Sequence, residues 1–166
     1  MAQHPRPKIS PEQALDSATE QLLQRPGFLL RRCLQLTSGV FEQSCAEIGL
    51  TARQYDYLFV LDIAEELGQT ELAEAVGLDK ATNTLVIKIL ERKQWVQRAV
   101  APHDSRMKVV RITEDGRHVF ASAKRAADRS ICAVSNPLTG QEYEQLLALM
   151  RKVALHGDTS AVADVP

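Results

Sequence analysis

Two short helical segments separated by a tight turn, and followed at once by extended segments, constrain the fold of this chain most. Residues 70–76 carry an apolar stripe that ends at Gly77, and Thr70 is placed to cap the helix that they form. Asp79 is placed to cap a second helix over residues 80–93, whose buried side we expect to be Val86, Ile89 and Leu90. A turn of three or four residues that contains glycine is typical of a helix-turn-helix.

The residues after this pair of helices change from a helical to an extended pattern. Residues 95–100 and 108–112 are rich in β-branched side chains and predict two short strands, joined by a polar turn over residues 101–107. Two strands alone are marginally stable in water, so this hairpin has to pack against the helices. A hairpin that directly follows a helix-turn-helix makes a winged helix, and the expected fold class is mainly α with a two-stranded wing.

Helical periodicity continues on both sides of this winged helix. Thr51 and Gln54 have the spacing of a capping box, and the pairs Pro26-Gly27 and Asn136-Pro137 interrupt helices. The helices expected here cover residues 12–24, 28–48, 52–66, 113–134 and 140–155. Helices from both ends of the chain carry apolar stripes with no obvious partner in a chain of 166 residues, which predicts a homodimer.

The charge of the chain is unevenly distributed, although its formal sum is only −1. Residues 79–111 contain eight basic and three acidic side chains, so this window carries +5 and the remaining residues carry −6. A polyanion favours such a window, because contacts between phosphates and Lys or Arg release condensed counterions. A solvated helix face is the alternative interpretation of the same charges.

Composition and motif content exclude several other classes of protein. The sequence has no apolar run near the roughly 18 residues of a membrane span, and its first residues lack the apolar stretch of a signal peptide. We therefore expect a soluble, cytoplasmic protein. The four histidines follow no Cys/His ligand spacing, so neither a metal nor another cofactor is expected. Nucleophile, phosphate-loop and zinc-protease motifs are missing from the sequence, so an enzyme is not expected.

A known family shares this arrangement of motifs. The matching stretches are Leu72-Ala73, residues 76–82, 90–93 and 96–98, Pro102, Asp104-Ser105-Arg106 and the helix start Ile112-Thr113-Glu114-Asp115-Gly116. In this order and spacing, residues 28–155 resemble the MarR-type winged-helix transcription regulators. Gln94 departs from the family pattern, which usually has glycine directly after the second helix of the motif, the recognition helix.

The resemblance implies a homodimer that binds duplex DNA sequence-specifically, commonly as a repressor that a small ligand releases. We expect a flexible arm over residues 1–11, a single regulator domain over residues 12–155 and a disordered tail over residues 156–166. Within the domain, residues 51–112 are the expected DNA-binding lobe. The expected dimerisation helices lie in residues 12–48 and 113–155.

The recognition helix is expected to place its first turns in the major groove of DNA. Lys80, Asn83 and Lys88 are expected to lie away from the buried side of this helix, and their side chains can hydrogen-bond base edges. A solvated surface residue is the alternative for Asn83. The methyl groups of Ala81 and Thr84 suit contact with a thymine methyl group.

The wing and the helix before the recognition helix are expected to add further contacts. Arg106 at the wing tip suits insertion into a narrow minor groove, with Asp104 holding it in position. An exposed ion pair between the two is the alternative. Contacts to phosphates are expected from Gln69, Thr70, Thr82, Arg98 and Lys108. The alternative for Thr82 is a bond to the helix backbone, and the alternative for Arg98 and Lys108 is a solvated side chain.

The family also implies a pocket for a small effector between its first, second and fifth helices. Arginines beside aromatic rings suit a planar aromatic carboxylate, or the phosphates of its coenzyme A thioester. Ordinary surface or dimer ion pairs are the alternative role for these arginines. The candidate effector ligands are Arg31, Arg32, Arg53, Tyr55, Tyr57, Phe59 and His118.

Two other functions are compatible with a winged helix. One is a protein-interaction module without DNA binding, which the basic residues of residues 79–111 disfavour. The other is redox sensing, since some relatives carry a reactive cysteine directly before Phe-Leu-Leu. Here Gly27 precedes Phe28-Leu29-Leu30, and buried structural thiols are the expectation for Cys33, Cys45 and Cys132.

Overall fold

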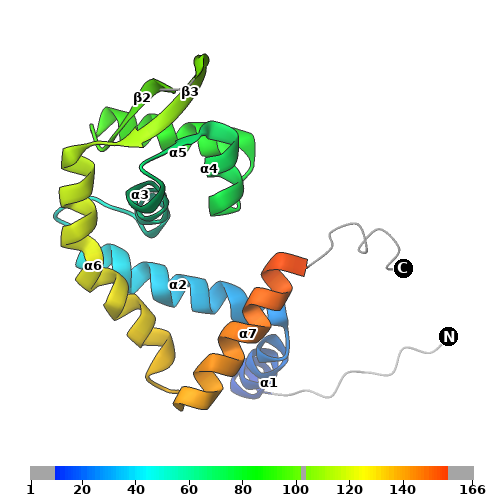
Figure 1. Ribbon diagram of the computed structural model, residues 1–166. Coiled ribbons are helices and arrows are strands. Elements are labelled where there is room, and N and C mark those ends of the chain that lie inside the picture. Colours follow the sequence, from blue (N-terminus) through cyan, green and yellow to red (C-terminus); the bar gives the residue numbers. More distant parts are fainter. Residues whose placement is uncertain (1–9, 102–103, 157–166) are drawn as a thin grey trace. The chain divides into compact units, whose positions relative to one another are not determined.

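Seven helices and three strands form the part of the chain that the computed structural model describes, which is residues 10–101 and 104–156, with the backbone alone for residues 101 and 104–107. In chain order they are α1 (Pro11–Leu23), α2 (Pro26–Ser44), α3 (Ala52–Ala64), β1 (Glu66–Gly68), α4 (Gln69–Val76), α5 (Lys80–Arg92), β2 (Val96–Ala101), β3 (Asp104–Ile112), α6 (Glu114–Ser135) and α7 (Gly140–His156) (Figure 1). The expected arm and tail fall mainly on residues 1–9 and 157–166, which lie outside the described residues.

The chain divides into two compact units, residues 1–36 and residues 37–166. In the first unit, Ser10 caps α1: its hydroxyl accepts from the Gln13 N–H at 3.2 Å, and Gln13 Oε1 accepts from the Ser10 N–H at 3.0 Å. Pro26 begins α2 two residues before the expected start, because proline at the first helical position costs no hydrogen bond. None of the described residues of this unit is buried, and its exposed leucines are Leu15, Leu22, Leu23, Leu29, Leu30, Leu34 and Leu36.

In the second unit, α3, α4, α5 and the sheet share one apolar core. Phe41 and Cys45 from the end of α2 and the turn after it, and Phe120 from α6, belong to the same core. The Thr51/Gln54 capping box that opens α3 is confirmed, with the Gln54 N–H 3.2 Å from Thr51 Oγ1. The largest fully buried side chains of this core include Tyr57, Leu58, Leu61, Leu72, Ile87, Leu90 and Val110.

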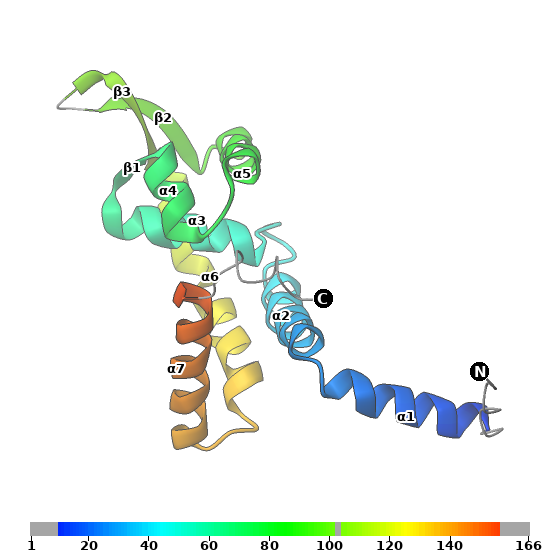
Figure 2. The ribbon, with the colours of Figure 1, turned by 90° about the vertical axis from the view of Figure 1, so that its right-hand side faces the viewer.

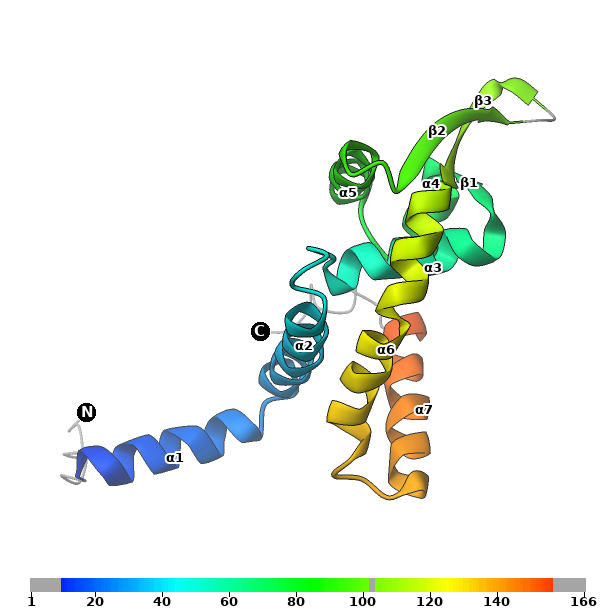
Figure 3. The same ribbon diagram turned by 90° about the vertical axis from the view of Figure 1, so that its left-hand side faces the viewer.

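The sheet is antiparallel with the strand order β1-β3-β2, so a short third strand extends the expected hairpin. The helix expected to run to Glu66 ends earlier, because Glu65 has a positive φ (62°), which no α-helix residue adopts, and residues 66–68 then pair with β3. A three-residue segment is stable as a strand only through that pairing. Strand β3 also starts at Asp104 rather than Lys108, which shortens the polar turn, and the hairpin projects beyond the helices (Figures 2 and 3).

The start of α6 is held tightly against the end of α5. Thr113 caps α6: its hydroxyl oxygen accepts from the Gly116 N–H at 3.0 Å and donates to the Gln94 carbonyl at 2.6 Å. The Thr113 N–H donates to the Trp95 carbonyl at 3.0 Å. A Cβ atom on Gly116 would lie 2.0 Å from that same carbonyl oxygen, so only glycine fits. The Thr-x-x-Gly sequence therefore has two physical roles here, a cap and a close backbone approach.

After Asn136-Pro137 the chain reverses direction into α7 (Figures 1 and 3). None of the described residues of α7 is buried within the chain. Leu149, Met150 and Val153 are 64%, 43% and 65% exposed. An apolar helix surface that the chain itself leaves uncovered is available to a partner.

Gln94 follows α5 in the left-handed region, with φ 61°. The Gln94 N–H donates to the Glu91 carbonyl and the Trp95 N–H to the Leu90 carbonyl, which is the hydrogen-bond pattern of a Schellman cap. Glycine adopts this backbone without a Cβ penalty. Gln94→Gly is therefore expected to raise the free energy of unfolding by about 0.5 to 1 kcal/mol in urea titrations at fixed chain concentration. An unchanged or lower value would show that Gln94 is unstrained.

Candidate functional site

The N-terminus of α5 is fixed by Asp79, as the sequence predicts. Asp79 Oδ1 accepts from the Ala81 N–H at 2.9 Å and from the Thr82 N–H at 3.0 Å, and Oδ2 accepts from the Thr82 hydroxyl at 2.6 Å. These bonds, chiefly the one from the Thr82 hydroxyl, hold the pKa of Asp79 below its usual range. Thr82 is therefore engaged in capping the helix.

The exposed face of α5 presents cations and small or apolar side chains. Lys80, Ala81 and Lys88 are exposed, as expected. Thr84 is half-buried, and its hydroxyl donates to the Lys80 carbonyl at 2.8 Å, which leaves its methyl group as the part available for contact. Leu85, which sequence reasoning omitted, is 58% exposed on this helix.

Asn83 is the main correction, because it lies inside the lobe rather than on the exposed face. Its side chain is 2% exposed, and Ile87, not Ile89, is the fully buried isoleucine of α5. The Tyr57 hydroxyl donates to Asn83 Oδ1 at 2.8 Å, and Asn83 Nδ2 donates to the Gln69 carbonyl at 2.8 Å. Asn83 thus joins α3, α4 and α5 through hydrogen bonds that occupy both ends of its amide.

The first turn of α4 lies next to the start of α5. Gly68, not Thr70, is the N-cap of α4, and its N–H donates to Glu71 Oε2 at 2.8 Å. Gln69 and Thr70 line a cavity of about 230 Å³ together with Lys80. Gln69 and Thr70 also line a neighbouring hollow with Lys108 from β3. The structure therefore brings four of the predicted DNA-contact residues together across α4, α5 and the wing.

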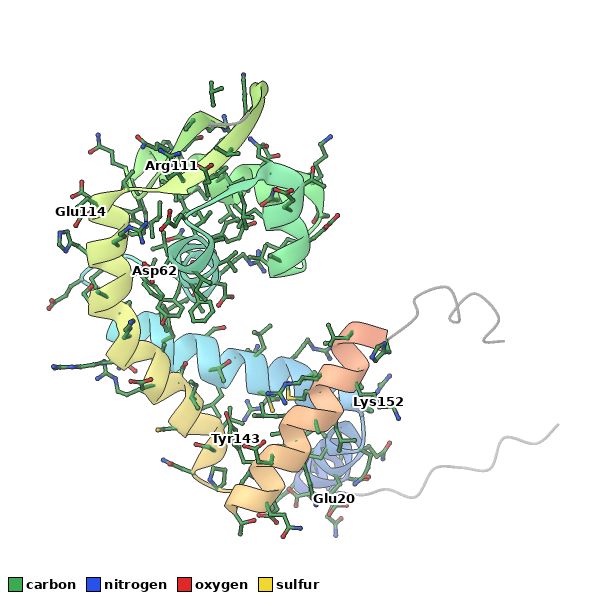
Figure 4. The ribbon with its side chains drawn as sticks, viewed as in Figure 1. Glu20, Asp62, Arg111, Glu114, Tyr143 and Lys152 are labelled. Carbon is green, nitrogen blue, oxygen red and sulfur yellow. The ribbon has the colours of Figure 1, made fainter. Side chains whose placement is uncertain are left out.

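The basic side chains of residues 79–111 are not equally available. The Lys93 ammonium donates to the Gly49 carbonyl and to Gln54 Oε1, and lies 4.3 Å from the centre of the Trp95 ring. Burial lowers the pKa of Lys93. Arg111 donates to Glu66 across the sheet, with Nε 3.0 Å from Oε2 (Figure 4). These two cations stabilise the lobe, and Lys80, Lys88, Arg92 and Lys108 are exposed.

The wing carries the remaining predicted contact residues. Arg98 is exposed, with its guanidinium 3.4 Å from the Glu91 carboxylate. The backbone of Asp104 and Arg106 belongs to β3, and the side chains of both lie outside the described part of the structure.

The residues predicted to bind an effector differ in exposure and in the groups that they contact. Tyr57 is fully buried, its hydroxyl is engaged by Asn83, and burial raises its pKa to about 12, so it is not a ligand-facing residue. His118 is exposed, 3.4 Å from Glu114, and Arg53 is exposed as well. Arg31 and Arg32 are exposed in the first unit.

Tyr55 and Phe59 belong to an aromatic cluster with Phe41 and Phe120, neither of which was among the candidates. The ring centres of Tyr55 lie 5.2 Å from Phe41 and 5.1 Å from Phe120, and those of Phe59 and Phe120 are 6.0 Å apart. Phe59 is 47% exposed, and the Lys124 ammonium lies 5.4 Å from the centre of the Phe120 ring. The cluster therefore offers an exposed aromatic edge beside a cation. Beside it, Arg117 of α6 is bound to Asp62 of α3 at 3.0 Å (Figure 4).

The cysteines differ in exposure. Cys45 is buried, as expected, and burial raises the pKa of its thiol, which makes it a poor nucleophile. Cys33 and Cys132 are exposed, so the expectation of buried thiols is wrong for these two.

Within the described residues, no three His, Cys, Asp or Glu side chains cluster as a metal site requires. No helix in that part of the chain has the length and apolar character needed to cross a membrane.

The chain is similar to known transcriptional regulators in both sequence and structure. The MarR family model matches residues 50–108. The chain is 30% identical over 148 residues to the HTH-type transcriptional repressor NicR of Pseudomonas putida, covering 88% of this chain and 93% of the relative. BpsR of Bordetella bronchiseptica, whose DNA binding is regulated by 6-hydroxynicotinic acid, is similar in structure, with TM-score 0.73, 27% identity and coverage of 81% and 95%. CouR of Rhodococcus jostii bound to p-coumaroyl-CoA has TM-score 0.72, 26% identity and coverage of 83% and 97%.

Proposed function

Since the chain belongs to the MarR family of winged-helix, DNA-binding transcriptional regulators, we propose that it is a ligand-responsive repressor. Two copies bind an inverted-repeat operator, and a small aromatic acid or its coenzyme A thioester releases them. The observation that carries the DNA-binding part is the exposed cationic face formed jointly by α4, α5 and β3. Half-sites about one helical turn apart, near 34 Å, suit two recognition helices related by a twofold axis.

The proposed DNA contacts are those predicted residues whose side chains the structure leaves exposed or half-buried. Lys80, Ala81 and Lys88 meet base edges, and the Thr84 methyl group adds an apolar contact. Asn83 and Thr82 instead hold the recognition helix in place. Contacts to phosphates, which position the protein without reading sequence, come from Gln69, Thr70, Arg98 and Lys108.

The homodimer is supported by the apolar side chains that the chain leaves exposed near both ends. The leucines of α1 and α2 and the apolar residues of α7 are among the most exposed large hydrophobic side chains described. Exposed apolar helix surfaces of this kind are typical of protein–protein interaction sites. Covering these helices with a second copy removes that surface from water.

The effector is proposed to stack on the aromatic cluster of Tyr55, Phe59 and Phe120. The exposed part of Phe59 accommodates a planar ring, and the Lys124 ammonium supplies charge for a carboxylate or a phosphate. The ligands named for BpsR and CouR, an aromatic acid and an aromatic acyl thioester, have this chemistry.

Arg106→Ala is expected to weaken operator binding about ten-fold, because one charge-assisted contact in the minor groove is lost. Thermal unfolding should be unchanged, because residue 106 lies near the tip of the wing hairpin. Gel-shift titration at fixed salt measures the effect, and Arg25→Ala, at the boundary of α1 and α2, is a matched control. Equal affinities for Arg106→Ala and the unaltered chain would remove the wing from the binding mechanism.

Selection of bound duplexes from a random pool, repeated with 6-hydroxynicotinate, p-coumarate and p-coumaroyl-CoA, tests the proposed function. The expected result is an inverted repeat whose recovery falls in the presence of at least one of these compounds. Phe59→Ala should bind the same repeat but respond less to the compound. DNA binding weakens steeply as salt rises. If the affinity of the chain for the selected duplexes did not depend on salt, a protein-interaction module would be indicated instead. Indifference to the whole panel would contradict release by an aromatic acid.

A further inference from the structure

Leu85 is a large aliphatic side chain at the centre of the exposed face of α5. It is 58% exposed, whereas Asn83, Val86, Ile87 and Leu90 of the same helix are buried. At 100° per residue, position 85 lies about 140° to 160° from Asn83, Ile87 and Leu90, about 100° from Val86, and one turn after Ala81. Leu85 and Ala81 therefore form an apolar strip about 6 Å long on the face that carries Lys88.

The surroundings of this strip identify what covers it. Lys88 and Arg92 are exposed on the same side of the helix as the strip, and Lys80 is exposed at the N-terminus of the helix, so the strip lies beside cations. An apolar protein partner would have to desolvate these charges, which is costly. A duplex instead places phosphates at the rims of the groove and base edges at its floor.

Only one group on the floor of the major groove suits an aliphatic side chain, namely the C5-methyl group of thymine. Leu85 has neither a hydrogen-bond donor nor an acceptor, so it cannot read a polar base edge. It is the sixth residue of α5, within the first two turns that face base edges in helix-turn-helix proteins.

We propose that Leu85, supported by Ala81, reads the C5-methyl group of a thymine in each half-site. Leu85 is thus a specificity-determining residue. This inference rests on the proposed DNA-binding mode and adds to it the base that the apolar part of the recognition helix selects. Lys80 and Lys88 hold the helix in the groove, and Leu85 discriminates thymine from cytosine within it.

Deoxyuridine substitution tests the proposal, because it removes the methyl group and keeps every hydrogen-bonding group of thymine. Each thymine of the selected half-site is replaced in turn, and affinity is measured by fluorescence anisotropy for the unaltered chain, Leu85→Ala and Ile63→Ala. Ile63 is a matched control, an exposed aliphatic residue on α3. At one position the substitution should weaken binding by the unaltered chain and by Ile63→Ala about four-fold per half-site. Leu85→Ala should bind the thymine and uridine duplexes with less than about two-fold difference.

Three results would overturn the proposal: no position at which methyl removal matters, a methyl effect that Leu85→Ala retains in full, or a change in self-association of Leu85→Ala by sedimentation. If the unaltered chain selects no duplex at all, the proposed function fails and this inference fails with it. If a duplex is selected but recognition of the methyl group does not depend on Leu85, this inference alone is contradicted and the proposed function stands.

Discussion

Gly116→Ala is expected to lower the free energy of unfolding by about 3 kcal/mol, the largest effect of any single substitution considered for this chain. The new Cβ atom would lie 2.0 Å from the Trp95 carbonyl oxygen and 2.9 Å from a side-chain carbon of Ile112. The carbonyl is backbone and already accepts a hydrogen bond from the Thr113 N–H, so it cannot move away without breaking that bond. Relief of the contact therefore displaces α6 from the lobe.

Urea unfolding at fixed chain concentration measures this loss, and Gly140→Ala is the matched control. Gly140 is in the first turn of α7, as Gly116 is in the first turn of α6, and a Cβ atom there would meet nothing within 4 Å. The control should be as stable as the unaltered chain or slightly more stable, since alanine is the better helix former. Equal stability of the two variants would show that the approach of α6 to Trp95 is not as close as described.

Asn83→Ala is expected to lower the free energy of unfolding by about 2 kcal/mol. The change removes two hydrogen bonds and leaves the hydroxyl of the fully buried Tyr57 without its acceptor. Because the amide joins α3, α4 and α5, the loss should also reduce the discrimination between the operator and unrelated DNA. Tyr57→Phe removes the donor and keeps the ring, so its expected cost is smaller, about 1 kcal/mol.

This substitution also distinguishes the sequence-based expectation from the structure. Had Asn83 faced the groove, alanine would weaken operator binding and leave stability unchanged. Asn136→Ala, at the exposed end of α6, is the control for loss of an amide and should change stability by less than about 0.5 kcal/mol. Stability of Asn83→Ala equal to that of this control would contradict the buried hydrogen-bond network.

Local signals in the sequence predict much of the fold, because a helix cap is built from residues three or four positions apart. Thr51 with Gln54, Asp79, and Thr113 with Gly116 all cap the helices that they were expected to open. Even Gln94, noted as a departure from the family pattern, lies at a position whose left-handed backbone explains a preference for glycine.

The expectations that failed depend on contacts between distant residues. Asn83 was expected away from the buried side because that side was defined by Val86, Ile89 and Leu90, but Asn83 is buried, and Tyr57, 26 positions earlier, supplies a hydrogen-bond partner for its amide. Strand β1 forms only because Glu66 pairs with Arg111, 45 positions later. No residue near Glu66 signals that pairing. Asn83, by contrast, stands three positions before Val86 and seven before Leu90, so helical periodicity already places it on the buried side.

In the candidate site, too, local sequence signals predicted some features, and contacts between distant residues determine the others. The exposure of Lys80, Ala81 and Lys88 followed from helical periodicity, whereas the aromatic cluster required Phe120 of α6 to reach Tyr55 and Phe59 of α3. Leu85 was missed because apolar residues of a helix are usually assigned to its buried side.

The central claim is that two copies of this chain bind one duplex, each with its own recognition helix. Sedimentation equilibrium of the chain with a labelled duplex that carries the selected inverted repeat measures the mass of the complex directly. We expect two 18.4 kDa chains per duplex at low salt, and loss of the complex as salt rises. A complex with a single chain, or a duplex that sediments alone at every salt concentration, would contradict it.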